Sequence, residues 1–151
     1  MQNSNPDKHE YMVRDYTDSD YSQVVSLWEE TRLSNSARGD DERIIRESIQ
    51  IGGRLLILEE VKTRKVTGTS WMTFDGRRIH LHHFGVLPGY QGKGLSKILL
   101  IESLRHVKAK GYQVKLEVHN TNKKAVALYE KFGFKRLGDY DVYIIRDLNE
   151  I

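Results

Sequence analysis

Apolar residues in this chain repeat with two spacings, and each spacing predicts a different kind of element. Apolar positions three and four residues apart predict helices over about 17–31, 40–51, 93–110 and 122–132. Alternating or continuous apolar runs predict strands over 11–16, 55–61, 65–74, 78–86, 113–118, 135–137 and 141–147. The order β-α-α-β-β-β-α-β-α-β-β predicts a mixed α/β fold, with a central, mostly antiparallel sheet of six to seven strands flanked by four helices.

Turn residues mark the boundaries between these elements. Asp75-Gly76 is a strong hairpin turn between two of the predicted strands, and residues 33–39 (LSNSARG) have the composition of a loop. Gly111 and Gly133 follow the last two predicted helices, as is common at helix ends. Residues 55–86 should therefore form an antiparallel meander that leads into the next helix.

Length and composition predict one folded domain. The chain has 151 residues, which suits a flexible tail over 1–10 and a single domain over 11–151. The polar start MQNSNPDKHE is unlike a signal peptide, and no apolar run approaches the roughly 18 residues that cross a bilayer, so we expect a cytoplasmic protein without membrane contact. The absence of cysteine excludes disulfides, thiolate metal sites and a cysteine nucleophile.

Charge is unevenly distributed between the two halves of the chain. Residues 1–75 carry 10 Lys and Arg against 14 Asp and Glu, a net charge of −4, whereas residues 76–151 carry 14 against 7, a net charge of +7. A basic half is compatible with a polyanionic ligand such as a nucleotide. Aromatic residues are not interleaved with the lysines as stacking platforms would be, so nucleic acid is not an expected partner.

Residues 84–96 (FGVLPGYQGKGLS) join a predicted strand to a predicted helix through a glycine-rich loop. Glycines allow consecutive backbone N–H groups to converge, and the first turn of a helix adds unpaired donors and a positive dipole end. The stretch is therefore suited to binding phosphate. It matches neither common nucleotide loop, because a P-loop would need glycine at Leu87 and a dinucleotide fingerprint would need glycine at Lys97.

Two sequence signatures follow one another in the second half of the chain. The first is Gln91-Gly-Lys-Gly94-Leu-Ser96, after a strand that ends Val-Leu-Pro, and the second is NKKAVALYEKFGF over residues 122–134. Together they resemble the GNAT superfamily of acetyl-CoA-dependent N-acetyltransferases, over about residues 11–148. The motifs are most similar to the ribosomal-protein N-terminal alanine acetyltransferase branch. The resemblance implies the GNAT-type fold.

The resemblance also implies that acetyl-CoA binds as the acyl donor. The backbone of Gln91 to Ser96 would hold the pyrophosphate, and the strand edge from Phe84 to Val86 would pair with the pantetheine arm, with Gly85 leaving room for close approach. Ser96 departs from the Gly or Ala of the family, but serine is small and keeps its N–H. Alternatively, the glycines only form a tight turn. The expected cofactor-binding residues are Phe84, Gly85, Val86, Gln91, Gly92, Lys93, Gly94, Leu95, Ser96, Asn122, Ala125 and Tyr129.

The resemblance suggests Tyr129 and Glu117 as catalytic residues. Tyr129 would act as a donor to the departing CoA thiolate, since the reference pKa values of tyrosine (about 10) and of a thiol (about 8.5) both lie above neutral pH. Glu117 would accept the proton of the amine; His80, His82, His83 or water are the other candidates. Tyr129 could instead be a packing residue, and Glu117 a solvated glutamate.

His80 and His82 stand two residues apart on one predicted strand, a spacing that could also bind zinc. Further ligands would have to come from Glu117 or His119, and cysteine is absent. We therefore expect no metal.

The expected function is transfer of an acetyl group from acetyl-CoA to a primary amine by direct attack. The acceptor, a small-molecule amine or the N-terminal or lysine amine of a protein, is not identified by the sequence. Residues that could shape its pocket are Trp28, Asp40, Asp41, Glu42 and 140–143, but the favoured interpretation of the three acids is that they only cap the second helix. A monomer and a homodimer are both compatible with the sequence. The alternative function is a non-catalytic acyl-CoA-binding sensor or interaction module on the same fold.

Overall fold

The computed structural model describes residues 9–33 and 39–151. Most of the tail predicted over 1–10 and most of the loop predicted over 33–39 lie outside the described residues. Within the described part, no helix has the length and apolar character needed to cross a membrane.

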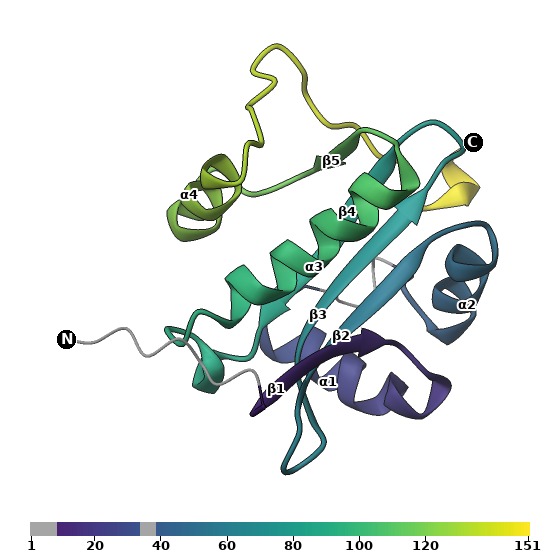
Figure 1. Ribbon diagram of the computed structural model, residues 1–151. Coiled ribbons are helices and arrows are strands. Elements are labelled where there is room, and N and C mark those ends of the chain that lie inside the picture. The colour runs from purple at the N-terminus through teal and green to yellow at the C-terminus, as the bar shows by residue number, and fades with distance from the viewer. Residues whose placement is uncertain (1–8, 34–38) are drawn as a thin grey trace.

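A five-stranded sheet forms the centre of the molecule, and its strands are neighbours in the order in which they occur along the chain (Figure 1). The first four strands pair antiparallel, and the fifth pairs parallel to the fourth. The parallel pair is possible because a helix connects the two strands. The strands are β1 (Tyr11–Asp15), β2 (Arg54–Glu60), β3 (Lys65–Phe74), β4 (Ile79–Val86) and β5 (Val114–Leu116).

Helices cover both faces of this sheet. The helices α1 (Tyr21–Glu30) and α2 (Glu42–Gln50) pack on one face, and α3 (Leu95–Lys110) and α4 (Lys123–Lys131) pack on the other, with α3 crossing in front of the sheet in Figure 1. Short 3₁₀ turns occupy Asp18–Asp20, Pro88–Tyr90 and Leu148–Glu150. The predicted four helices are thus confirmed.

Strand periodicity produces two hydrophobic cores, one on each face. In β2, Leu55 and Ile57 point toward Trp28 of α1, whereas Leu56 and Leu58 point toward Leu99 of α3. Successive side chains of a strand alternate between faces, so a continuous apolar run is buried on both sides. All four of these strand residues are at most 2% exposed.

The sheet has five strands rather than six to seven, and the last two predicted strands are not formed. Residues 135–147 belong to no described strand, and a turn at residues 138–139 interrupts them. A strand needs a hydrogen-bonding edge, and β5, the nearest edge in sequence, is only three residues long rather than the predicted 113–118. The helix predicted from about residue 93 begins at Leu95, because Gly94 before it has a left-handed backbone.

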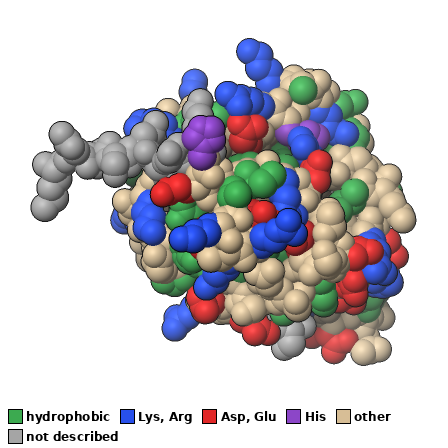
Figure 2. Space-filling view, turned by 60° about the horizontal axis from the view of Figure 1, so that its bottom comes forward, with side chains coloured by type: hydrophobic (Ala, Val, Ile, Leu, Met, Phe, Trp, Pro, Cys, Tyr) green, Lys and Arg blue, Asp and Glu red, His purple; other side chains and the backbone are tan. Residues whose placement is uncertain are grey.

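Charges of both signs mix on the face that carries the lower end of Figure 1. In Figure 2 the Lys and Arg side chains on this face are interspersed with Asp and Glu. The Arg14 guanidinium of β1 bonds both Asp20 and Glu59, with nitrogen–oxygen distances of 2.8 and 2.7 Å. A face of this kind differs from the continuous basic surface that binds a nucleic acid backbone.

Candidate functional site

The two central strands of the site, β4 and β5, diverge partway along their length. They pair only through Ile79, His80 and Leu81 of β4. Against β3, the register shifts so that Trp71 faces His82 while Thr69 faces Gly85, which leaves two residues of β4 opposite one of β3. This is a β-bulge, and a bulge bends its strand. The edge of β4 beyond Leu81 is therefore not paired by β5.

Buried side chains beneath the sheet hold the bulge in place. His83, within the bulge, has a positive φ of 43°, which is uncommon outside glycine. The hydroxyl of Thr69 donates to the His83 carbonyl at 2.7 Å and accepts from Trp28 Nε1 at 2.9 Å. Trp28 stacks on Trp71 with ring centroids 5.5 Å apart. These contacts compensate the strained backbone of His83.

The His83 ring lies under the sheet rather than in open solvent. Its centroid is 4.3 Å from that of Trp28, and its side chain is 7% exposed. The carboxylate of Asp40 is 3.0 Å from Nε2, but neither ring nitrogen has a partner with hydrogen-bond geometry among the described residues. The contact with Asp40 is thus a close approach without hydrogen-bond geometry. It connects the start of α2 to the bulge.

A cleft of about 850 Å³ occupies the divergence between β4 and β5. Its walls are β4, the loop before α3, the residues directly after β5, α4, and Thr31 to Leu33 after α1. Of the predicted cofactor-binding residues, all except Lys93 line it: Phe84, Gly85, Val86, Gln91, Gly92, Gly94, Leu95, Ser96, Asn122, Ala125 and Tyr129. Glu117, His80, His82 and His83 line it too. The structure therefore brings residues from 80 to 129 into one site.

The glycine loop before α3 presents a row of backbone donors. Gly92 and Gly94 have φ values of 80° and 76°, a conformation that glycine adopts at little cost. Within the described chain, no acceptor binds the N–H groups of Gly92 to Lys97, and the first bonded amide is Ile98, which donates to Gly94 O at 3.4 Å. Unbonded N–H groups at a helix N-terminus form an anion site. Ser96 keeps its N–H in this row.

Gln91 has a structural role that its place in the motif does not reveal. Its Nε2 donates to the carbonyl of Val86 at 3.0 Å, which ties the glycine loop to the end of β4. The Gln91 side chain is therefore turned toward the protein. This contact fixes the distance between the strand edge and the row of N–H groups.

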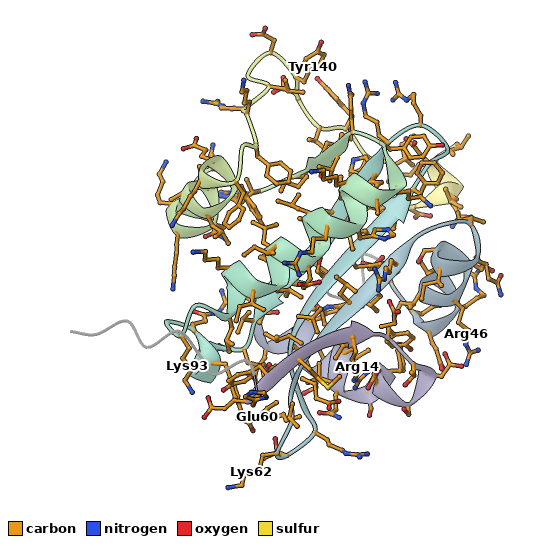
Figure 3. All side chains as sticks on the ribbon, in the orientation of Figure 1. Arg14, Arg46, Glu60, Lys62, Lys93 and Tyr140 are labelled. Atoms are coloured by element: carbon orange, nitrogen blue, oxygen red, sulfur yellow. The ribbon has the colours of Figure 1, made fainter. Side chains whose placement is uncertain are left out.

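Positive side chains surround the loop. The Nζ atoms of Lys93 and Lys65 lie 5.2 and 5.5 Å from the ring centroid of Tyr90. Figure 3 shows Lys93 at the end of the molecule where α3 begins. Lys97 and Lys124 line the cleft itself. Cations beside unbonded N–H groups favour a polyanionic ligand.

Gly85 leaves space for another part of the protein. A Cβ added at this position would lie 2.8 Å from Cδ1 of Leu33, which follows α1. The close approach that we expected for a ligand is thus made, on this side of the strand, by Leu33. The sequence could not show this contact, because 52 positions separate the two residues and neither carries a pattern that pairs them.

Tyr129 lies deep in the cleft, on α4. Its ring packs edge-on against Phe84 of β4 and Phe134, with centroids 5.8 and 5.6 Å away. Burial raises the pKa of Tyr129 to about 12. The phenol therefore stays protonated across the physiological range, and it has a proton to donate. Its ring is packed, whereas the residue also lines the cleft.

Asn122 caps α4, as the sequence allowed. Its side-chain oxygen accepts from the N–H of Ala125 at 3.3 Å. An N-cap of this kind supplies an acceptor for one of the unpaired N–H groups in the first turn. It holds the start of α4, and with it Tyr129, beside the cleft.

Three polar side chains share one face of β4 and β5 at the cleft. His80 and His82 stack with centroids 5.2 Å apart, and Glu117 follows β5 on the same side. Burial lowers the pKa of His82 to about 4, and burial also lowers the pKa of His80, with Glu117 acting in the opposite direction. Both rings are therefore neutral near pH 7 and can accept a proton.

Thr73 orients His82, and sequence reasoning missed it. The hydroxyl of Thr73 lies 2.8 Å from Nε2 of His82 across the β3–β4 pair. No local pattern marks Thr73, because the pairing depends on the register of the hairpin. Among the described residues, no group of three or more His, Asp or Glu side chains could hold a metal ion.

The residues suggested for an acceptor pocket do not gather at the cleft. Trp28 is buried beneath the bulge, Asp41 caps α2 by accepting from the N–H of Ile44 at 2.9 Å, and Glu42 bonds Arg46 at 2.8 Å. Asp40 lies against His83, and residues 140–143 are exposed. None of them lines the cleft.

Comparison with known proteins identifies the family of this chain. The pattern of the Acetyltransferase (GNAT) family matches residues 11–134, most of the chain. This chain belongs to the GNAT family of acetyltransferases. The match is shorter than the 11–148 expected from the sequence, and it stops at Phe134, before the residues that form no strand.

Solved structures of acetyltransferases share the fold. One is an acetyltransferase from Streptococcus agalactiae 2603, with a TM-score of 0.75 and 23% identity, covering 91% of this chain and 93% of that chain. Another is PaiA N-acetyltransferase from Thermoplasma acidophilum in complex with coenzyme A, with a TM-score of 0.70 and 21% identity, covering 87% of this chain and 92% of that chain. A third is glucosamine-6-phosphate N-acetyltransferase from Arabidopsis thaliana, with a TM-score of 0.69 and 21% identity, covering 91% of this chain and 98% of that chain. These structural similarities show the fold of this GNAT chain.

Proposed function

We propose that this GNAT enzyme transfers an acetyl group from acetyl-CoA to a primary amine by direct attack. The observation that carries the proposal is the cleft between β4 and β5, where an unpaired strand edge leads to a row of unbonded N–H groups. The pantetheine arm of acetyl-CoA carries amides that are complementary to the strand edge. The pyrophosphate at the end of this arm is complementary to the row of N–H groups. A coenzyme A complex of a protein with this fold supports the choice of donor.

The chain's residues fit the donor in polarity as well as in shape. The N–H groups from Gly92 to Lys97 and the lysines around them would hold the phosphates. The edge of β4 from Phe84 to Val86 would bond the amides of the arm, as one strand bonds another. A thioester bound this way supplies an acetyl carbonyl carbon that an amine nitrogen attacks, with loss of the thiolate. Fixing the two reactants in line supplies most of the acceleration.

Tyr129 would stabilise the leaving sulfur. A phenol with a pKa of about 12 does not transfer its proton fully to a thiolate with a reference pKa of about 8.5. It donates a hydrogen bond to the developing negative charge instead, beside the apolar rings of Phe84 and Phe134. We therefore assign Tyr129 as a donor to the sulfur rather than as the source of the final thiol proton.

Glu117 is the proposed base, and His80 is the alternative. Near neutral pH an alkyl amine is mostly protonated, because its pKa lies near 10, so a base must receive the proton before attack. Glu117 lines the cleft beside the neutral ring of His80. Glutamate at this position is a feature of the ribosomal-protein N-terminal alanine acetyltransferase branch, but the comparisons give no support for placing the chain there. The assignment of Glu117 as the base therefore rests on its position in the cleft.

The acceptor is proposed only as a class: a small-molecule amine or an amine of a protein. Glu117 and the histidine face, formed by His80 and His82, can accommodate a cationic amine and, after it loses a proton, the neutral amine. The acids at the start of α2 would not contribute, because Asp41 and Glu42 bond within their own helix. One protein of the same fold is named for the acetylation of glucosamine-6-phosphate, a small-molecule amine.

Binding and turnover test the proposal separately. Saturating acetyl-CoA should raise the melting temperature, and labelled acetyl-CoA should transfer its label to one class in a screen of amines and peptides. An unchanged melting temperature would contradict the donor. Tight binding without turnover across the screen would favour the non-catalytic sensor.

The rate profile identifies the base. Glu117→Gln should remove the loss of rate at low pH, and His80→Gln should leave it unchanged. If His80→Gln removes this loss of rate and Glu117→Gln leaves it unchanged, His80 is the base. Equal profiles for both variants and the unmodified enzyme would point to water.

A further inference from the structure

The proposed reaction assigns no role to Arg32, a positive side chain of the cleft. The lysines that line the cleft, Lys97 and Lys124, belong to the first turns of α3 and α4, whereas Arg32 follows α1. The core beneath α3 and α4 and the core beneath α1 lie on opposite faces of the sheet (Figure 1). Arg32 therefore reaches the cleft from the face opposite to α3, at whose N-terminus the donor phosphates would bind.

The backbone of Arg32 has a conformation that glycine usually adopts at the end of a helix. Its φ is 57°, and the N–H groups of Arg32 and Leu33 donate to the carbonyls of Glu29 and Trp28 at 3.2 and 2.9 Å. This pair of bonds is a Schellman motif, whose left-handed position is most often glycine because a Cβ is strained there. Strained residues are concentrated at functional sites, which agrees with a binding role for the Arg32 side chain.

The end of α1 holds Arg32 beside the bulge of β4. Leu33, the next residue, lies so close to Gly85 that a Cβ added there would be 2.8 Å from its Cδ1. The ring of Trp28 donates to Thr69, and Thr69 donates in turn to the backbone of the bulge. These contacts fix the backbone of Arg32 at the edge of the cleft.

The guanidinium of Arg32 is not neutralised by any described acid. It is exposed and forms no ion pair with a described residue, whereas Arg14, Arg46 and Arg54 are each paired with a carboxylate. Glu117 is the one Asp or Glu among the described residues that line the cleft. Because a guanidinium donates two parallel N–H groups to a carboxylate or a phosphate, Arg32 is suited to an anionic group of a ligand.

The proposed base lies on the same face of the sheet as Arg32. Leu116 and Val118 pack against the core beneath α3, so Glu117 between them points to the opposite face. That face is the one that α1 covers. An acid for an ammonium group and a cation for an anionic group therefore reach the cleft from one side.

We propose that the acceptor is a small-molecule amine that also carries a carboxylate or phosphate group, and that Arg32 binds this anionic group. The inference rests on the proposed function, because it places the amine at Glu117. The two side chains are complementary to a molecule that carries both charges. They line a single cleft of about 850 Å³, a volume typical of small-molecule sites, which the acceptor would share with the arm of the donor.

Matched pairs of amines test the inference, with labelled acetyl-CoA as donor. Amino acids and their amides differ in the carboxylate, and aminoalkyl phosphates and the corresponding amino alcohols differ in the phosphate. In one of the two series, kcat/KM of a charged amine should exceed that of its neutral partner by about tenfold or more. That series identifies the anion.

The outcomes separate this inference from the proposed function. If the unmodified protein transfers label to neutral amines or to peptides as well as to the charged amines, this inference fails and acetyl transfer stands. If it transfers label to no amine at all, the two fail together.

Arg32→Gln should remove the preference for the charged amine while keeping a side chain at the strained position. KM for the charged amine should rise by about tenfold, with little change in kcat or in KM for acetyl-CoA, and Arg32→Lys should restore part of the loss. Arg64→Gln is the matched control: Arg64 is exposed with a φ of 59°, but it lies between β2 and β3 and does not line the cleft. An unchanged preference in Arg32→Gln, or weaker acetyl-CoA binding, would overturn the proposal.

A glycine at the same position separates binding from folding. Arg32→Gly should raise the melting temperature, because glycine adopts the left-handed conformation without strain, and it should lose the preference for the charged amine as Arg32→Gln does. A glycine variant that keeps the preference would show that the guanidinium does not bind the acceptor.

Discussion

The proposed donor and acceptor sides of the cleft are built in different ways. The proposed donor side consists mainly of backbone: the edge of β4, two glycines with left-handed conformation and N–H groups at the start of α3. The proposed acceptor side consists of individual side chains on β4 and directly after β5, chiefly His80, His82 and Glu117. A backbone site depends on a few residues with fixed spacing. A side-chain site depends on which strands lie together and in which register.

This difference explains why one side can be inferred from a motif and the other cannot. Coenzyme A presents the same amides and phosphates to every enzyme that uses it, so one backbone arrangement serves many proteins. Acceptors differ in charge and shape, and each requires its own side chains. The predictions below test whether the two sides really separate in this way.

The largest effect is expected at the glycine loop. Gly92→Trp should weaken acetyl-CoA binding by more than about a thousandfold, or about 4 kcal/mol, because the side chain would occupy the phosphate position. Gly76→Trp is its control: both glycines have positive φ, 80° and 86°, and an added Cβ meets nothing within 4 Å at either. Both changes should cost about 1 kcal/mol of stability from backbone strain. Equal acetyl-CoA affinity in the two variants would contradict a phosphate site at Gly92, as measured by calorimetry.

Tyr129→Phe should affect turnover rather than donor binding. Loss of one hydrogen bond to a developing charge costs about 1.5–3 kcal/mol, so kcat should fall roughly tenfold to a hundredfold with little change in KM for acetyl-CoA. Tyr140→Phe, at a residue that is 79% exposed, should change neither. Because the pKa of Tyr129 is about 12, its ionisation should not appear in the rate profile below pH 10. An unchanged kcat would leave Tyr129 as a packing residue.

The histidine face should make folding sensitive to acid. The pKa of His82 is about 4 in the folded state and about 6.5 in an unfolded chain, so between these values the unfolded chain binds the proton first. The contribution of this group is complete above pH 6.5 and is lost as the pH falls toward 4. From pH 7 to pH 5 it should amount to about 1–2 kcal/mol, and His82→Gln should lose less stability over that interval. Urea unfolding at the two pH values measures this; equal losses would contradict it.

The smallest effect is expected at Gly85 of β4, whose backbone lies against the side chain of Leu33. Gly85→Ala places a methyl group 2.8 Å from the end of the Leu33 side chain, which can move at a cost of about 1 kcal/mol. Leu33→Ala should remove the conflict, so the double variant should be less destabilised than the two single effects added together. A double-mutant cycle by urea unfolding measures the coupling. Strict additivity would show that Leu33 is not the contact that requires glycine at this position.

Much of the fold could be predicted, because its signals are local. The continuous apolar run of β2 and the hairpin at Asp75-Gly76 each depend on neighbours in sequence, and the structure confirms both. The prediction of the last two strands was wrong. Residues 142–145 (VYII) have the composition of a strand, but composition does not supply a partner edge. The glycine loop before α3 could be recognised from its sequence, and its role toward the donor, implied by the family resemblance, stays a prediction. The links from Thr73 to His82 and from Leu33 to Gly85 were missed, because they arise only when the chain folds.

The pair of indole rings beneath the bulge has an optical consequence. The chain contains two tryptophans, Trp28 and Trp71, and they stack on each other against the ring of His83. All of the indole fluorescence of this protein therefore originates directly under the strand that would hold the acyl donor. A ligand that shifts β4 should change the emission without any attached dye, so the native protein can report its own occupancy in a stopped-flow instrument.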